Sequence, residues 1–441
     1  MKYKLFFTAL IALSMVSKSF SQSAATDSLS LSDALKLTLS SSNSIQQAAY
    51  LLNASEARVE QSRSSLYPDA NVSLNYAWIG PIPAFSFPGF GNIVLAPDNN
   101  WDEHVAITST IYDFDKREKN IEYIKSQVRG SKDKIEYIKQ DLAYRTAQNF
   151  YSIIFLKKSI EVQLDQINTL KQHLEWTKKK VDAGTATDFD LLTTQVRISS
   201  AENAKIGLEN SLAASEINLK RLMGLPPNGE VNPSGRFTDV PVNTNLDSLL
   251  VAGYQSRIEI KSAEDQIAVA KSQYEVASTV NNPTLNVAFV YGFKNGYEPN
   301  LYSWRGNFAL AAQVLIPVSR YVPYFGGYKE ESMHQEAMAN MKAAESYRDD
   351  MTGQIKAEIQ KAVADIRFSI EKIHTTEAAI NQAESALNLA KIRYDAGTVT
   401  NLDLLDAETS LSESKLMRLE ALYRYILGIY ELKQAAGDKI W

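Results

Sequence analysis

One twelve-residue pattern occurs twice in this chain, and its two copies divide the chain into equivalent halves. Residues 181–192 read VDAGTATDFDLL, and 213 positions later residues 394–405 read YDAGTVTNLDLL. Repetition at a fixed offset indicates one structural unit used twice. Each copy ends a series of apolar residues spaced seven apart, the spacing of coiled-coil helices: Ile153, Ile160, Ile167, Leu174 and Val181, then Ile366, Ile373, Ile380, Leu387 and Tyr394. We therefore predict two long coiled-coil helices that end at the same kind of turn.

The predicted helices are unusually long. Residues 115–181 and 328–394 contain no proline and a single glycine each. At a rise of 1.5 Å per residue, either segment would form a helix about 100 Å long. Return helices at about 187–223 and 400–436 would complete an antiparallel helical hairpin in each half.

Four shorter segments have the alternation of a β-strand, at about 70–78, 105–112, 284–291 and 307–316. In the first of them, Val72, Leu74, Tyr76 and Trp78 share one face and small or polar residues occupy the other. The segment between the first two strands contains four prolines, so we expect a loop there. The fold class is thus mainly α, with long antiparallel coiled-coil hairpins and four strands per chain.

These elements define the domain organisation. Residues 1–21 begin with Lys2 and Lys4 and continue with an apolar run, as in a signal peptide. Residues 22–228 form the first repeat and residues 246–441 the second, joined by a linker at 229–245. Each repeat is predicted to contain an opening helix, two strands, a long helix, a turn and a return helix. The opening helices are expected at about 31–66 and 246–278.

Composition excludes several classes of function. The chain has 46 Lys and Arg against 51 Asp and Glu, which gives a formal charge of −5 and no basic excess for binding nucleic acid. It has no cysteine, so no disulfide is expected. The four histidines lack the spacing of metal ligands, and no nucleophile or phosphate-binding motif is present. We assign no catalytic residue, metal or cofactor.

The strand count favours an oligomer. A sheet of four strands has two unpaired edges, and closed membrane barrels begin at about eight strands. Two chains would supply eight strands, whose interior is filled by side chains, whereas three chains would supply twelve and leave a lumen. Apolar stripes on both helical hairpins require further helical neighbours, as a ring of hairpins would provide.

The ordered set of elements resembles the TolC family of outer-membrane efflux and secretion channels. The turns at Gly184–Thr185 and Gly397–Thr398 carry the resemblance, as does the Tyr-Asp-Ala-Gly-Thr-x-Thr-x-x-Asp-x-x-Asp pattern at residues 394–406. The resemblance implies a homotrimer with a 12-stranded barrel in the outer membrane and an α-helical barrel across the periplasm. It also implies a non-enzymatic exit duct for an inner-membrane pump, with a periplasmic adaptor docked at or near the helical tips.

The resemblance also assigns site residues. Acidic residues after the second turn form the narrowest ring of such channels, and the matching positions here are Asp403 and Asp406. A network that ties the hairpins together matches Asp190 and Tyr394. The best-known members have an arginine directly after the second Gly-Thr, whereas this chain has Val399. A closing latch must therefore be weaker here or use other groups.

Purely structural roles are alternatives for these residues. Thr187 and Thr400 each stand three positions before an aspartate, the spacing of a helix capping box, so capping alone could explain Asp190 and Asp403. Asp406 lies beyond the first helical turn and could belong to a solvated face. Tyr394 continues the heptad series and could serve packing alone.

An alternative function is a non-conducting periplasmic coiled-coil scaffold or adaptor. An adaptor would be expected to have one helical hairpin flanked by globular β-domains, whereas this chain has two hairpins and strands with an apolar face. An enzyme is a more distant alternative, because the chain has no nucleophile or metal-ligand constellation.

Overall fold

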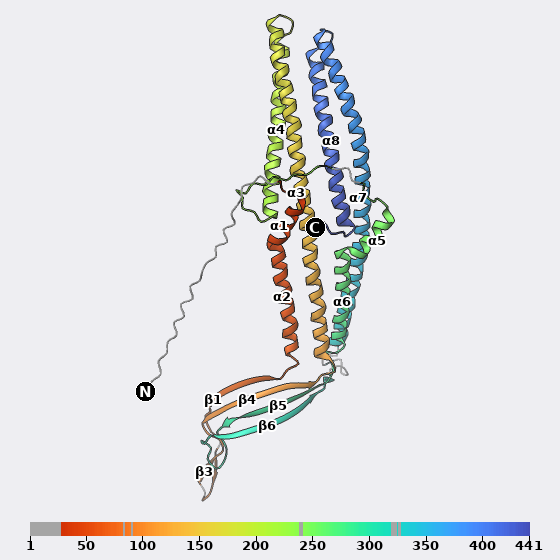
Figure 1. Ribbon diagram of the computed structural model, residues 1–441. Coiled ribbons are helices and arrows are strands. Elements are labelled where there is room, and N and C mark those ends of the chain that lie inside the picture. Colours follow the sequence, from red (N-terminus) through yellow and green to blue (C-terminus); the bar gives the residue numbers. More distant parts are fainter. Residues whose placement is uncertain (1–27, 83, 90, 238–240, 319–323, 325–327) are drawn as a thin grey trace, which may run out of the picture.

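The computed structural model describes residues 28–82, 84–89, 91–237, 241–318, 324 and 328–441. The predicted signal peptide at residues 1–21 lies outside these residues. Figure 1 shows an elongated molecule with a β-sheet at one end and the tips of two helical hairpins at the other.

Four long helices build the hairpins. The first hairpin contains α3 (Lys116–Asp182) and α4 (Asp188–Leu222), and the second contains α7 (Tyr328–Asp395) and α8 (Asn401–Ala435). The predicted long helices are confirmed, since α3 has 67 residues and α7 has 68. Helices α3 and α8 pack against each other, so α4 and α7 lie on the two outer sides (Figure 1). None of the helices in the described part of the chain is long and apolar enough to cross a membrane.

The opening helix of each repeat is in two pieces, whereas the sequence analysis predicts one continuous helix. The first repeat has α1 (Leu31–Ser41) and α2 (Asn43–Ser64), and the second has α5 (Leu246–Ser256) and α6 (Ile258–Ala277). The residues at the breaks, Ser42 and Arg257, have extended backbone conformations. Ser42 caps α2 by accepting the amide of Ile45, and Arg257 donates to the carbonyl oxygen of Gln434 in α8. In each repeat, the break follows a first helix of 11 residues, and these contacts stabilise it.

The main sheet contains β1 (Asp69–Trp78), β4 (Asn99–Tyr112), β5 (Thr284–Lys294) and β6 (Arg305–Leu315). All neighbours are antiparallel in the order β1-β4-β5-β6, so β1 and β6 are the two edges. The predicted loop between the first two strands also holds a two-stranded hairpin, formed by β2 (Ala84–Phe87) and β3 (Gly91–Val94). This hairpin was not predicted from the sequence.

The two faces of the main sheet differ in chemistry. The register aligns four apolar residues across the strands in one row on one face: Val72, Val105, Tyr291 and Phe308. The adjacent row, on the opposite face, is polar or small: Ser73, His104, Gly292 and Asn307. The apolar side chains are largely exposed, with Phe308 at 75%. This sheet has one apolar face that no other part of the described chain covers.

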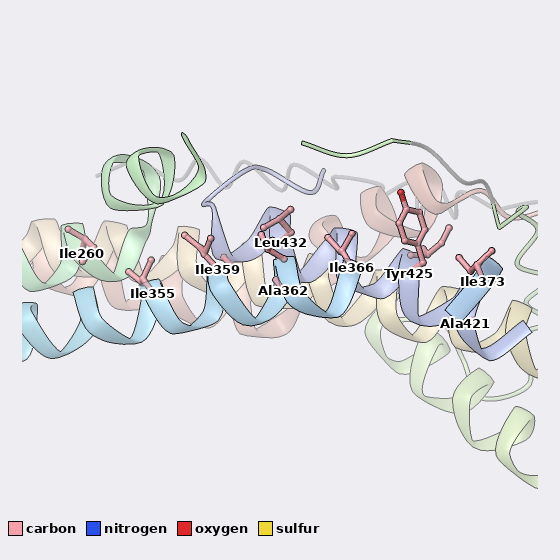
Figure 2. Packing of buried hydrophobic residues seen from close by; sticks show 12 residues of the cluster. Ile260, Ile355, Ile359, Ala362, Ile366, Ile373, Ala421, Tyr425 and Leu432 are labelled. Atoms are coloured by element: carbon pink, nitrogen blue, oxygen red, sulfur yellow. The ribbon is translucent and has the colours of Figure 1, made fainter. Parts of the chain in front are cut away.

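The largest core lies where α7 and α8 meet α5 and α6, and Figure 2 shows its aliphatic side chains pointing into the space between these helices. Ile359, Ile366 and Ile373 occupy successive heptad positions of α7 and are buried there. A second cluster joins α1, α3 and α4 around Phe150 and Ile153. The other heptad residues are buried or half-buried, and the half-buried ones are Ile160, Leu174, Val181 and Ile380.

Candidate functional site

Both hairpins end in the same hydrogen-bonded turn. Gly184 and Gly397 have positive φ angles of 71° and 69°, which glycine adopts without the steric cost of a side chain. The amides of Thr185 and Thr398 donate to the carbonyl oxygens of Lys180 and Arg393, at 2.8 and 2.9 Å, which closes each helix in the manner of a Schellman motif. The two threonine hydroxyls donate to the same carbonyl oxygens. The repeated turn sequence is therefore explained by helix termination.

The aspartates that follow each turn are helix caps. The Asp190 carboxylate accepts the amide of Thr187 at 2.9 Å, and the Asp403 carboxylate accepts the amide of Thr400 at 2.8 Å. Each threonine hydroxyl in turn accepts the amide of its aspartate. Hydrogen bonds from Thr400 lower the pKa of Asp403. Both carboxylates are thus engaged in complete capping boxes, and they carry negative charge at the positive end of a helix.

Asp406 makes a contact between the hairpins. Its carboxylate oxygen lies 2.6 Å from a guanidinium nitrogen of Arg197 in α4. Neither side chain is buried, and the pair joins the first hairpin to the second just beyond the turns. Asp406 is therefore an exposed residue near the tip that forms an ion pair with the other hairpin.

Tyr394 lies in a group of aromatic side chains between the two hairpins near the tip. Its ring centroid is 5.1 Å from that of Trp176 and 5.7 Å from that of His173, both in α3. The Lys180 ammonium lies 4.1 Å from the centroids of Trp176 and Tyr394 and donates to the carbonyl oxygen of Tyr394. Such cation–π contacts are worth about 0.5–2 kcal/mol. Burial raises the pKa of Tyr394, so its phenol stays neutral and holds α7 against α3.

A buried polar network connects three helices beside this aromatic group. His173 Nε2 lies 2.6 Å from Oδ1 of Asn401, the first residue of α8. The Asn401 amide donates to the main-chain oxygen of Asp190 and to the Thr194 hydroxyl, both in α4. Burial lowers the pKa of His173, which makes the imidazole neutral at neutral pH with Nε2 as the donor. The network ties α3 and α4 to the start of α8.

Val399 occupies the position at which the resemblance leads one to expect an arginine. It packs in an apolar cluster with Leu387, Tyr394 and Leu404 and makes no charged contact. Arginine and lysine contacts between the hairpins are instead supplied by Arg197 and Lys180. The tip therefore has cross-hairpin links, but they come from α3 and α4 and not from the second turn.

Known proteins are similar to this chain over most of its length. The outer membrane efflux protein family matches residues 34–225 and 253–438. The chain belongs to the outer membrane efflux protein family. It is 23% identical to outer membrane protein TolC of Vibrio cholerae over 86% of this chain and 84% of that protein. It is also 23% identical to the alkaline protease secretion protein AprF of Pseudomonas aeruginosa, over 77% and 71% of the two chains.

Solved structures have the same fold. The outer membrane protein VceC of Vibrio cholerae superimposes with a TM-score of 0.78 at 19% identity, over 93% of this chain and 97% of that one. The predicted TolC-like fold is confirmed. This efflux protein is an exit duct located in the outer membrane with a periplasmic part, and it is not an enzyme. The scaffold or adaptor alternative is thereby set aside.

Four contributors to the site of this efflux protein were not predicted from its sequence: Lys180, His173, Arg197 and Asn401. All four act across helices that are distant in sequence, so no local spacing marks them. Asn401 had the strongest available signal, because a polar residue directly after a capping threonine is placed at the first turn of a helix.

In the described residues, no group of three or more His, Cys, Asp or Glu side chains could hold a metal ion.

Proposed function

We propose that three copies of this chain form a continuous duct that is closed at the helical tips and receives its cargo from a pump through a periplasmic adaptor. The observation that carries the proposal is a pair of apolar stripes on the outer helices α4 and α7, which no other part of the described chain covers. On α4 the stripe contains Phe189, Leu192 and Val196, and on α7 it contains Leu389 and Ile392.

The two stripes lie at equal distances along their helices from the turns. Phe189 follows its turn glycine by five residues and Ile392 precedes its own by five, while Leu192 and Leu389 are each eight residues away. Phe189 is 74% exposed and Ile392 is 67% exposed. Because α4 and α7 are the outer helices of the chain, a rotation axis would bring α4 of one copy against α7 of the next. This is a head-to-tail contact, which closes into a ring when the rotation allows it.

The sheet requires the same closure. The edge strands β1 and β6 have backbone groups without a strand partner, and such groups are costly in lipid. Pairing β6 of one copy with β1 of the next in a ring of three gives twelve strands, with the apolar face of each sheet toward lipid. The opposite face, which carries Ser73, His104 and Asn307, would then line the lumen.

The gate of the duct is proposed at the tips. In a trimer, Asp403 and Asp406 of each copy would be repeated around one axis, together with Asp190 and Tyr394. The structure supports a closed tip through the Arg197–Asp406 pair and the Asn401 network, which hold the hairpins of one copy together. Opening would require these contacts between hairpins to separate while the capping boxes within each hairpin remain.

The exposed turns around Gly184–Thr185 and Gly397–Thr398 are the proposed contact sites for the adaptor. Each turn is closed by main-chain hydrogen bonds, and both lie at the end of the molecule farthest from the sheet (Figure 1). The secretion role in the name of AprF supports a place in a tripartite efflux or type I secretion system with an inner-membrane pump.

The orientation can be tested by labelling introduced cysteines. We expect Ser86→Cys, in the exposed β2–β3 hairpin, to react with a membrane-impermeant maleimide in intact cells, because this hairpin lies at the end of the sheet away from the helices. The matched control Ser200→Cys on α4 should react only after the outer membrane is breached. The chain has no native cysteine to interfere. Equal protection of both cysteines in intact cells would contradict the orientation.

A further inference from the structure

Glu408 is a buried carboxyl group that the tip contacts do not use. It lies on α8 five residues after Asp403 and is 6% exposed. Its Oε2 atom accepts no hydrogen bond from any residue that the structure describes. The side chain faces a cavity of about 60 Å³ at the junction of three helices, where α3 contributes Gln166 and Thr169 and α7 contributes Leu387. Both repeats of the chain therefore meet at this carboxyl group.

The surroundings offer the ionised carboxylate no hydrogen-bond donor among the lining hydroxyls. Ser412 Oγ donates to Gln166 Oε1 at 2.9 Å, and Thr169 Oγ1 donates to the main-chain oxygen of Asp165 at 3.0 Å. Leu387 and Leu411 supply apolar wall. A buried carboxylate that accepts no hydrogen bond is strongly disfavoured relative to the protonated acid.

Three charged residues face the site. Asp165 on α3 and Lys415 on α8 line the cavity, and Lys391 on α7 favours the ionised form through its charge. No lysine or arginine in the described residues forms an ion pair with Glu408. Burial is the larger effect and raises the pKa of Glu408 to about 7.

We propose that Glu408 is a proton-operated lock between the two hairpins, protonated while α8 packs on α3 and ionised when the tip opens. This inference rests on the proposed gate at the tips. The protonated acid fits the cavity without a partner ion, whereas ionisation draws water or a cation into the space and favours separation of α8 from α3. Protons arriving from the periplasmic side would therefore favour the closed tip.

The direction of the pH effect follows from the two states. Above its ordinary pKa of about 4.5, an exposed Glu408 loses its proton while the packed one keeps it until about pH 7. Below pH 4.5, Glu408 is protonated in both states, so its burial does not destabilise the packing of α8 on α3. As the pH rises from 4.5 to 7, the packed state becomes progressively less stable relative to the open state. Since each pKa unit is a factor of ten, the open-to-closed ratio should rise by about a hundredfold across this range.

The test is single-channel recording of the full trimer in planar bilayers from pH 5 to pH 8 at constant ionic strength. We expect the open probability of the unmodified protein to rise with pH, and that of Glu408→Gln to stay at the low-pH value throughout. Glu413→Gln is the matched control, because Glu413 is exposed on the same helix, and it should keep the pH response. A pH response in Glu408→Gln equal to that of the unmodified protein would overturn the proposal.

A second measurement separates failure of the lock from failure of the proposed gate. Thermal unfolding of the same variants reports the ionisation of Glu408 whether or not the protein conducts. Glu408→Gln should raise the melting temperature at pH 8 and leave it nearly unchanged at pH 4.5, because only the ionised acid destabilises the packed tip. Equal changes at both pH values would show that Glu408 is not protonated in the packed state, and the lock would be rejected.

Discussion

Breaking the ion pair between Arg197 and Asp406 should raise the conductance of the channel several-fold. An exposed pair of this kind contributes only about 0.2–1 kcal/mol, but a trimer repeats it three times at one constriction. Arg197→Ala removes the 2.6 Å contact that joins α4 to α8, and Asp406→Asn removes the charge of its acceptor and so the ion pair. Single-channel recording in planar bilayers at neutral pH measures the effect.

The two variants distinguish loss of the Arg197–Asp406 ion pair from loss of the negative charge of Asp406. In the proposed trimer, Arg197→Ala would leave three Asp406 carboxylates unpaired at the proposed gate, so it should open the tip and strengthen block by multivalent cations. Asp406→Asn should open the tip and relieve that block. Glu413→Gln is the control, because Glu413 is exposed on the same helix and lies outside this contact, so conductance and cation block should stay unchanged. Unchanged conductance in both Arg197→Ala and Asp406→Asn would place the constriction elsewhere.

Oxidation of a chain carrying both Phe189→Cys and Ile392→Cys should produce covalent dimers and trimers. The proposed contact places α4 of one copy beside α7 of the next at matched distances from the two turns. Within one chain, α3 and α8 lie between these helices, so the two cysteines cannot pair internally. Denaturing electrophoresis without reductant reports the products.

A second pair of cysteines serves as the control for this crosslink. Ile206→Cys combined with Ile392→Cys also places cysteines at exposed positions on α4 and α7. Residue 206 lies 17 residues beyond residue 189, which is about 25 Å along the helix. This pair should stay monomeric after oxidation. Equal crosslinking of both pairs would mean that collisions, and not a defined contact, form the disulfides.

Local signals in the sequence were sufficient to predict the hairpins and their ends. Heptads specify the buried side of a long helix, and a glycine followed by a threonine capping box ends one helix and starts the next. The caps at Asp190 and Asp403 were an open alternative in the sequence analysis, and the structure contains both. These features depend on residues within a few positions of one another.

Features that depend on distant residues were not predicted. The break at Arg257 relies on a contact to α8, and the sequence of α5 and α6 is helical on both sides of it. The β2–β3 hairpin was also not predicted, although its residues are close together in the sequence. Its prolines indicated a loop, whereas Gly89 and Gly91 have the positive φ angles that permit a tight hairpin. The Arg197–Asp406 pair and the cavity at Glu408 arise only when the two repeats pack together.

The mass of the purified protein in detergent tests the central claim most directly, because every part of the proposed duct requires three copies. Native mass spectrometry should show a complex of three mature chains that persists on dilution. A stable species with the mass of one chain, still folded and still able to increase the conductance of a bilayer, would contradict the account.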